Sequence, residues 1–257
     1  MTNGEIVRIA MEQSAVDLGC RPEDFLKSEN VTVESLCHPD ARKYLKLPFF
    51  CQLVTYGNNV VASGAKEFLP EIKKYVSRFS WYRCFETPQL HVLEKALLPY
   101  GHKVCFMAEY FLPDMNELKE KNCPYPVRVL EKGAFEQLYL PEWSNALCFD
   151  RKHLDVLAVG AYDGDTLIGL AGVSADCDTM WQIGIDVLPA YRRQGIASAL
   201  VSRMAREVLE RGKVPFYCCA WSNVLSARTA VAAGFKPAWV EMTAKPCALI
   251  DEMNGEN

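Results

Sequence analysis

The residues from Ile183 to Ala197 have the types and the spacing needed to bind a phosphorylated molecule. They form an apolar strand, a turn and the start of an amphipathic helix. The first amide N–H groups of a helix have no partner inside the helix, and the helix dipole is positive at that end. Gly195 lets a phosphate approach the backbone closely, and Arg192 and Arg193 add positive charge. We therefore expect an anion-binding loop here.

Two common phosphate-binding loops are excluded. The chain has no GxxxxGK[ST] sequence, which is the signature of a P-loop. It also has no GxGxxG sequence between a strand and a helix with an acidic residue further on, which is the dinucleotide-binding fingerprint. The phosphorylated ligand must therefore be bound by a different kind of loop.

The pattern Arg192-x-x-Gly195-x-Ala197 resembles the acyl-coenzyme A loop of the GNAT superfamily of N-acyltransferases, which reads Arg/Gln-x-x-Gly-x-Gly/Ala. A second motif follows the helix: a buried strand over 214–221, Asn223-x-x-Ser226, a short helix, Gly-Phe and a further strand over about 238–243. The second half of a GNAT domain has these features in this order. The resemblance covers residues 125–246, about half of the chain.

The resemblance implies that acetyl-CoA is the co-substrate. Its pyrophosphate would lie on the first amide groups of the helix, and its pantetheine arm would lie along the preceding strand and beside the second motif. In the resembling family this strand, here Gln182–Leu188, has a bulge that offers backbone N–H groups to the thioester. The expected cofactor-binding residues are Val187, Arg192, Arg193, Gln194, Gly195, Ile196, Ala197, Ser198, Asn223 and Ser226.

Acyl transfer to an amine requires the protein to hold both reactants, polarise the thioester carbonyl and move a proton. The resembling family often has a tyrosine that acts as general acid, and this chain has Ala230 at that position. Some members have a glutamate as general base; the matching position here is close to Trp181, which cannot act as a base. Either the thiolate leaves unaided, or another group supplies the proton, or the protein does not catalyse. The candidate catalytic residues are Asp186, Asp176 and Ser222. For each aspartate, the alternative is a hydrogen-bonded carboxylate at the end of a strand.

The residues expected to contact the acceptor are Trp143, Asn145, Trp181 and Glu241. In the resembling family the region between the first two helices usually forms the acceptor wall, and Trp143 and Asn145 fall in that region. Together with Trp181 they could form a pocket lined by aromatic rings and an amide. The alternative is that both tryptophans are core or rim residues.

Composition limits the class of protein. Of 257 residues, 50% are hydrophobic and 23% are charged, which is ordinary for a globular protein, and the net charge of −4 argues against a nucleic-acid partner. No apolar run approaches the ~18 residues that span a bilayer, and the first residues do not resemble a signal peptide. We expect no membrane partner and a cytoplasmic location. Eleven cysteines without a Cys-x-x-Cys pair and four isolated histidines predict reduced thiols and no metal site.

The pattern of apolar residues predicts a mixed α/β sheet in two domains. Residues 1–124 would form a smaller α/β domain that shapes the acceptor site or forms a dimer contact, and residues 125–257 would form the GNAT-like, acetyl-CoA-binding catalytic domain. We expect helices at 3–18, 69–79, 89–98, 135–143 and 195–211, hairpins at 49–63 and 154–174, and a linker at 112–126. Further strands are expected at 103–111, 127–130 and 180–188.

Residues 94–110 and 227–243 resemble each other weakly, since each contains the end of a helix, a glycine and an apolar strand. The first domain would then be a degenerate half-copy of the second; alternatively, helix–glycine–strand is simply a common unit. The first half of the chain lacks the Arg-x-x-Gly-x-Gly/Ala loop, so no cofactor site is expected there.

The expected function is an N-acetyltransferase that moves an acetyl group from acetyl-CoA to an amine of a small molecule by direct attack in a ternary complex. The acidic net charge slightly favours a cationic acceptor such as a polyamine or an aminoglycoside-like compound, and a homodimer is possible. The alternative is a non-catalytic acyl-CoA-binding sensor or regulatory module, which Ala230 and the missing glutamate favour. The sequence does not identify the acceptor or the length of the acyl chain.

Overall fold

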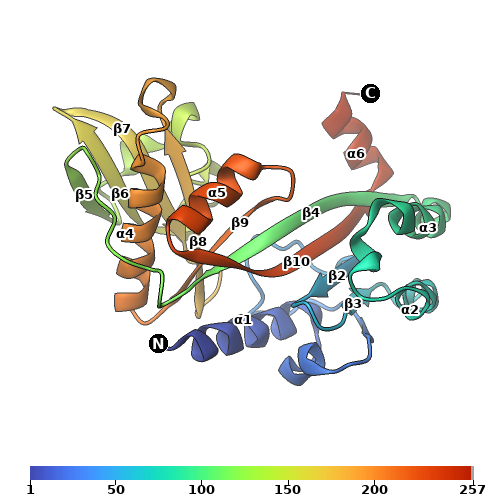
Figure 1. Ribbon diagram of the computed structural model, residues 1–257. Helices are drawn as coiled ribbons and strands as arrows, with labels where there is room; N and C mark the ends of the chain where they lie inside the picture. Colours follow the sequence, from blue (N-terminus) through green and yellow to red (C-terminus); the bar gives the residue numbers. More distant parts are fainter. Residues whose placement is uncertain (256–257) are drawn as a thin grey trace. The chain divides into compact units, whose positions relative to one another are not determined.

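The computed structural model describes residues 1–255, which divide into two compact units. Unit 1 contains residues 1–10 and 111–237, and unit 2 contains residues 11–110 and the described residues from 238 onward. Three elements contribute residues to both units: α1 (Asn3–Leu18), β4 (His102–Pro113) and β10 (Phe235–Pro246) (Figure 1). The units therefore differ from the predicted division at residue 124, because residues 1–10 and 111–124 pack in unit 1 and residues after 237 pack in unit 2.

Unit 1 is built on a mixed sheet, as the sequence predicts. The strands β5 (Val127–Glu131), β6 (Asp155–Asp163), β7 (Thr166–Ser174) and β8 (Met180–Val187) are successive antiparallel neighbours. The next strand, β9 (Val214–Ala220), pairs with β8 in parallel. The chain passes from β8 to β9 through α4 (Ile196–Glu210), and from β9 to β10 through α5 (Val224–Ala232) (Figure 1).

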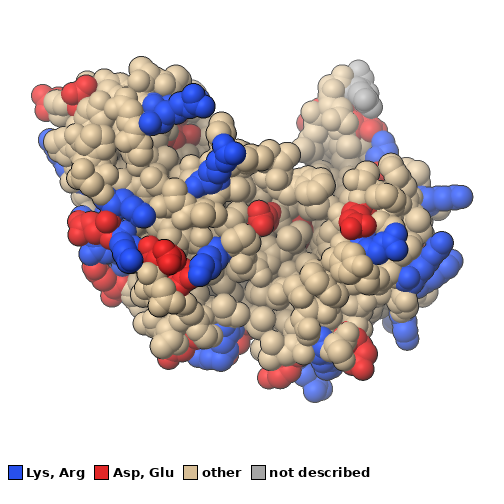
Figure 2. Space-filling view, viewed as in Figure 1, with Lys and Arg blue, Asp and Glu red and all other residues tan. Residues whose placement is uncertain are grey.

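Helix α4 covers one face of this sheet. Its apolar residues recur every fourth position, so they form one stripe that is buried against β6, β7 and β8. These residues are Ile196, Leu200, Met204 and Val208. On the solvent side α4 carries ion pairs of Arg203 and Arg211 with Glu207, and Figure 2 shows basic and acidic side chains interspersed over this part of the surface.

The opposite face of the sheet is covered by the segment between β5 and β6. The prediction of a helix over 135–143 is wrong: the segment contains short 3₁₀ turns at Glu136–Leu138, Pro141–Trp143 and Phe149–Leu154. Pro141 has no N–H group and its ring would clash with the preceding turn of an α-helix. Phe135, Trp143 and Leu147 pack there against Ala158 and Leu170.

The segment expected to be a linker is instead packed onto unit 1. Strand β4 continues to Pro113, and after it Leu118, Cys123 and Tyr125 contact the core beneath α4. The backbone oxygen of Lys119 accepts a hydrogen bond from the hydroxyl of Ser202 on α4 at 2.6 Å. Residues 114–126 thus form a strap along α4.

Unit 2 contains β1 (Val31–Glu34), β2 (Cys51–Thr55) and β3 (Val61–Gly64), together with the later part of β10. Strand β3 is parallel to β1 and antiparallel to β2, and β2 is antiparallel to β10. The helices α2 (Leu69–Arg78) and α3 (Thr87–Leu97) confirm two predictions, whereas β1 and the final helix α6 (Cys247–Asn254) were not predicted. Further 3₁₀ turns lie at Pro22–Leu26, Arg83–Phe85 and Leu98–Tyr100.

No helix of the described residues has both the length and the apolar composition required to cross a membrane.

Candidate active site

The loop between β8 and α4 has an unusual backbone. After a 3₁₀ turn at Pro189–Tyr191, Arg193 adopts φ 64° and Gly195 adopts φ 81°, both in the left-handed region. Left-handed residues within a turn direct successive N–H groups into one concave surface that binds anions. Arg193 is the one non-glycine residue of the described chain with a positive φ. Such backbone strain is often associated with a functional site.

The start of α4 is open to a ligand. Gly195 is the N-cap and offers no side chain to the first amide groups, and the first bond of the helix runs from the N–H of Ala199 to the oxygen of Gly195 at 3.1 Å. A Cβ atom built on Gly195 would have no atom within 4 Å, so the space above the backbone is clear. The arrangement fits a phosphate group, which the amides of residues 193–198 would bind.

Two arginines and one glutamine flank this loop. The Nε of Arg192 donates to the backbone oxygen of Val187 at 3.0 Å, which fixes the turn to the end of β8. Arg193 is exposed and makes no hydrogen bond or ion pair through its side chain with residues 1–255, so its guanidinium is available to a ligand. Gln194 accepts a hydrogen bond from the hydroxyl of Tyr125 at 3.1 Å.

The parallel pairing of β8 and β9 stops before either strand ends. The last pair is Ile183 with Tyr217, although β8 continues to Val187 and β9 continues to Ala220. The N–H of Leu188 donates to the oxygen of Ile168 and therefore points toward β7. The N–H and C=O groups of successive residues in a strand point to opposite sides, so those of Ile185 and Val187 point toward β9. A pantetheine arm could add its amides to this edge. The bulge implied by the resemblance is not seen, since β8 pairs with β7 in regular register.

The segment at Asn145 and Ala146 lies directly on the sheet. A Cβ atom on Gly184 would come within 1.9 Å of the backbone oxygen of Asn145, and one on Gly172 within 2.0 Å of that of Ala146. The two glycines are paired across β7 and β8, so together they make the flat surface on which the segment rests.

Asp186 holds the same segment in place. Its carboxylate accepts hydrogen bonds from the N–H of Asn145 at 2.8 Å, the N–H of Ala146 at 2.9 Å and the side-chain amide of Asn145 at 2.7 Å. The structure thus brings together the candidates Asp186 and Asn145, and it gives Asp186 a positioning role whether or not it also accepts a proton.

The other acceptor candidates are not brought together. Trp143 is buried with Phe135 on one face of the sheet, whereas Trp181 packs in the core beneath α4 on the other face. The pocket expected between the two tryptophans is therefore not formed by them. Glu241 lies in unit 2, where it is buried, accepts a hydrogen bond from Trp239 at 2.8 Å and forms an ion pair with Arg42.

The remaining catalytic candidates differ in exposure. Asp176 is 0% exposed and lies 3.8 Å from the guanidinium of Arg151. Ser222 is exposed in the turn before α5. Asn223 caps α5, because its side chain accepts a hydrogen bond from the N–H of Ser226 at 3.2 Å. Ala230 is 0% exposed, so the position of the family tyrosine is filled by core packing.

A hydroxyl pair at the end of the β8–β9 ladder escaped the sequence analysis. The hydroxyl of Tyr217 lies 2.7 Å from that of Ser226, and the ring is 3% exposed. Burial raises the pKa of Tyr217 to about 12, so the phenol is protonated at neutral pH. Tyrosine in an apolar strand gives no sign of function; its relation to Ser226 depends on how α5 packs over β9.

A buried carboxylate was missed as well. Asp155 is fully buried and accepts hydrogen bonds from Ser174, from the N–H of Cys148 at 2.9 Å and from the hydroxyl of Tyr139 at 3.0 Å. Burial raises its pKa, although these bonds oppose the shift. Ser174 ends β7, whereas Tyr139 and Cys148 lie in the segment between β5 and β6, so Asp155 ties the end of the β6–β7 hairpin to the segment that covers it.

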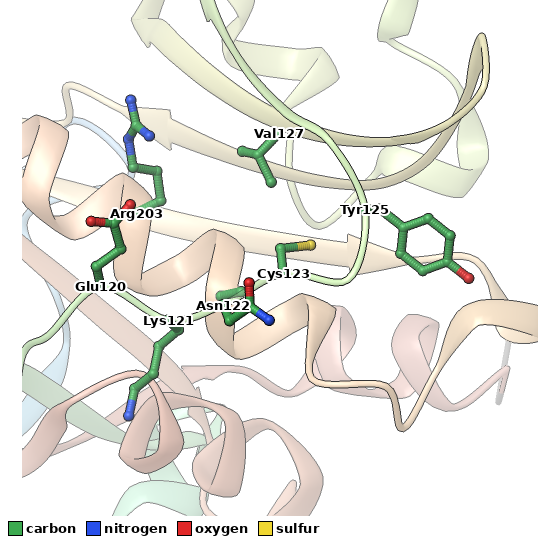
Figure 3. A pocket seen from close by; sticks show the side chains of 8 residues that line it. Glu120, Lys121, Asn122, Cys123, Tyr125, Val127 and Arg203 are labelled. Atoms are coloured by element: carbon green, nitrogen blue, oxygen red, sulfur yellow. The ribbon is translucent and has the colours of Figure 1, made fainter.

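A pocket of about 410 Å³ lies beside the anion-binding loop, between the strap and α4. Figure 3 shows Tyr125 at one end of its lining and Arg203 and Glu120 at the other, with Cys123 between them. Tyr125 connects the pocket to the loop through Gln194, and Ala199, which also lines the pocket, donates its N–H to the oxygen of Gly195. Among the described residues, no group of three or more His, Cys, Asp or Glu could hold a metal ion.

Comparison with known proteins shows the family to which part of unit 1 is similar. Residues 115–235 match the model of the acetyltransferase (GNAT) family. These residues form a GNAT-family domain. The match begins in the strap and ends at the first residue of β10, so the GNAT domain lies within unit 1 and includes the strap that the sequence analysis had placed outside it. A search of curated proteins found no match for the chain.

Seventy-one chains of solved structures match this chain. One is a putative GNAT acetyltransferase from Novosphingobium aromaticivorans, with 16% identity, coverage of 56% of this chain and 66% of that chain, and a TM-score of 0.45. A conserved protein of unknown function from Staphylococcus epidermidis has 16% identity, coverage of 75% and 86%, and a TM-score of 0.46. A tandem GNAT protein from the clavulanic acid biosynthesis pathway has 13% identity, coverage of 60% and 57%, and a TM-score of 0.45. The chain spans about two thirds of the length of the first of these structures.

Proposed function

We propose that the GNAT domain binds acetyl-CoA and transfers its acetyl group to an amine of a small molecule by direct attack in a ternary complex. The observation that carries the proposal is the open, uncapped start of α4, preceded by two left-handed residues, Arg193 and Gly195. The pyrophosphate would lie on the amides of residues 193–198 with Arg193 beside it. The pantetheine arm would follow the edge of β8 at Val187, with Asn223 and Ser226 facing it.

In this proposal the protein mainly orients the reactants, because the thioester is already activated. Attack by the amine forms the new amide bond, breaks the carbon–sulfur bond and leaves a thiolate that must gain a proton. The hydroxyl pair of Ser226 and Tyr217 supplies a donor near the edge that the pantetheine would follow. Asp186 and Asp176 stay the predicted acceptors of the amine proton, and Ser222 stays a predicted alternative donor.

The second candidate function is an acyl-CoA-binding sensor without turnover. It is favoured by Ala230, which places a buried methyl group where the family often has a tyrosine. It is also favoured by the three hydrogen bonds that Asp186 already accepts.

The proposal is tested by titrating the protein with acetyl-CoA in a calorimeter and then following thiol release with a set of amines. We expect Gly195→Glu to weaken acetyl-CoA binding at least ~100-fold, because the added carboxylate fills the space for the phosphate. Gly212→Glu is the matched control: Gly212 also flanks α4, has φ 74° and has open space around its Cβ position, but it lies at the other end of the helix.

Each outcome of this experiment assigns a function. Binding that is lost only in Gly195→Glu, with thiol release on an amine, establishes the acetyltransferase. The same binding without release on any amine assigns the sensor. Equal affinity in both variants, or no binding by the unaltered protein, contradicts the proposed site.

A further inference from the structure

Unit 2 has a pocket of its own, at one end of its strands. Its volume is about 530 Å³, within the range of small-molecule sites. Because β3 is parallel to β1 and antiparallel to β2, and β2 is antiparallel to β10, the ends of β1, β3 and β10 meet the start of β2 at this edge. The start of β4 lies there too, since Cys247 N–H donates to the oxygen of Gly101 at 2.8 Å.

The pocket has cationic side chains without acidic partners. Lys46, Lys66 and Lys245 line it, and none of them forms an ion pair within residues 1–255. Glu34 and Glu67 also contribute to the lining, so the lysines leave a positive excess. Burial lowers the pKa of Lys245 and Cys105 opposes this shift, while repulsion by the charge of Lys46 lowers the pKa further. A bound anion would relieve this repulsion.

Flat apolar surfaces form the walls of the same pocket. The ring of Phe50 is stacked on that of His102, with centroids 4.0 Å apart and planes 10° apart. The Nζ of Lys245 lies 4.1 Å from the centroid of the Phe49 ring, and Pro48 and Pro246 complete the apolar lining. A ligand with a planar ring could pack against these side chains while its charged group faces the lysines.

Two polar side chains in the lining can each form a further hydrogen bond with a ligand. Ser35 is 4% exposed, and its hydroxyl oxygen accepts a hydrogen bond from the N–H of Phe49 at 2.9 Å. Within the described chain its own hydrogen has no acceptor. The Nδ1 of His102 bonds the carbonyl of Tyr100 at 2.8 Å and must therefore carry the hydrogen, which leaves Nε2 for a ligand.

We propose that this pocket, which we call the lysine pocket, binds a small molecule that combines a planar apolar ring with a carboxylate or phosphate group. The lysines and the hydroxyl of Ser35 would hold the anionic group, and Phe50 with His102 would hold the ring. The proposal concerns unit 2 alone and does not depend on acetyl-CoA binding by the GNAT domain.

The experiment uses the full chain labelled at histidine and follows the ring signals by NMR. The chain has four histidines, so His102 reports on the lysine pocket while His38, His91 and His153 serve as internal references. Phenyl phosphate and benzoate are the anionic probes, inorganic phosphate lacks the ring, and benzyl alcohol lacks the charge. We expect a saturable shift of His102 with phenyl phosphate or benzoate, with a dissociation constant of about 1 mM or tighter.

Variants separate this site from general effects. Lys245→Met should weaken the response of His102 at least ~10-fold. Lys73→Met, an exposed lysine of α2 outside the pocket, and Gly212→Glu, in the other unit, should respond as the unaltered protein does. The proposal is overturned if His102 does not shift with either anionic probe, if Lys245→Met binds as tightly as the unaltered chain, or if benzyl alcohol binds equally well. The relative affinities of phenyl phosphate and benzoate tell a phosphate ligand from a carboxylate ligand.

Discussion

Asp186 is the residue whose interpretation changes most between sequence and structure. A charged residue within an apolar strand is costly unless it is paired or functional, and this made it a candidate base. The structure gives it three hydrogen-bond donors, all from Asn145 and Ala146. The carboxylate of Asp186, which accepts these three hydrogen bonds, holds the segment in place. If it took a proton from an amine, the hydrogen bonds would weaken.

We expect Asp186→Asn to lower the free energy of unfolding by about 2 kcal/mol, because a neutral acceptor replaces a charged one for both backbone N–H groups, and the new amide nitrogen cannot accept from the side-chain amide of Asn145. Urea denaturation measures this, with the exposed Asp178→Asn as the control. If the variant unfolds like the unaltered protein but its kcat falls by ~10²–10⁴, Asp186 is the base and anchoring is secondary.

At the scale of elements, the segment between β5 and β6 depends on two small residues. Gly172 and Gly184 allow the backbone at residues 145–146 to touch the sheet, and Asp186 then holds it there. Pro141, which lacks an N–H group, favours the irregular structure observed just before this contact over a regular helix at 135–143.

Replacing Gly184 by alanine should lift this segment from the sheet, because the new methyl group meets backbone at 1.9 Å. We expect a loss of about 1–3 kcal/mol in unfolding free energy and weaker binding of the acceptor amine, with acetyl-CoA affinity retained. Gly4→Ala is the control, since nothing lies within 4 Å of its Cβ position and it is part of α1. Unchanged stability in Gly184→Ala would mean that the segment is not held against the sheet.

The elements with strong local signals could be predicted from sequence. The apolar repeat of α4 and the Asp-Gly turn between β6 and β7 gave bounds within one or two residues of those observed. The sites that failed depend on distant partners. Which face Trp143 and Trp181 occupy depends on strand register and on the path of residues 132–154, and the contact between Tyr217 and Ser226 depends on the packing of α5.

At the scale of the molecule, both segments of the weak internal resemblance adopt the same structure. Each is a helix, a left-handed glycine and a long strand: α3, Gly101 and β4 in one, and α5, Gly234 and β10 in the other. Each strand also begins in one unit and ends in the other. The half-copy stays a prediction, and the shared path of the chain is the feature that a duplication would produce.

The ends of unit 1 are joined by a single carboxylate. Asp114 accepts hydrogen bonds from the side chain of Asn3 at 2.8 Å and from the N–H of Asn116 at 2.9 Å, and it forms an ion pair with Lys236. It therefore connects the start of α1, the strap and the start of β10 within unit 1. The bond to Lys236, together with the two amide donors, lowers the pKa of Asp114 from 3.8 to about 2.

This lowered pKa predicts how stability depends on pH. A carboxylate whose pKa is lower in the folded state stabilises the fold fully above its ordinary value of 3.8, and the contribution disappears as pH falls toward about 2. Asp114→Asn lacks the contribution at every pH. We therefore expect the variant to be less stable than the unaltered protein at neutral pH, and the difference to shrink below pH 3.8. Urea midpoints over a pH series measure it, with the exposed Asp150→Asn as control; a difference that stays constant into the acid range would show that Asp114 acts through shape and not through its charge.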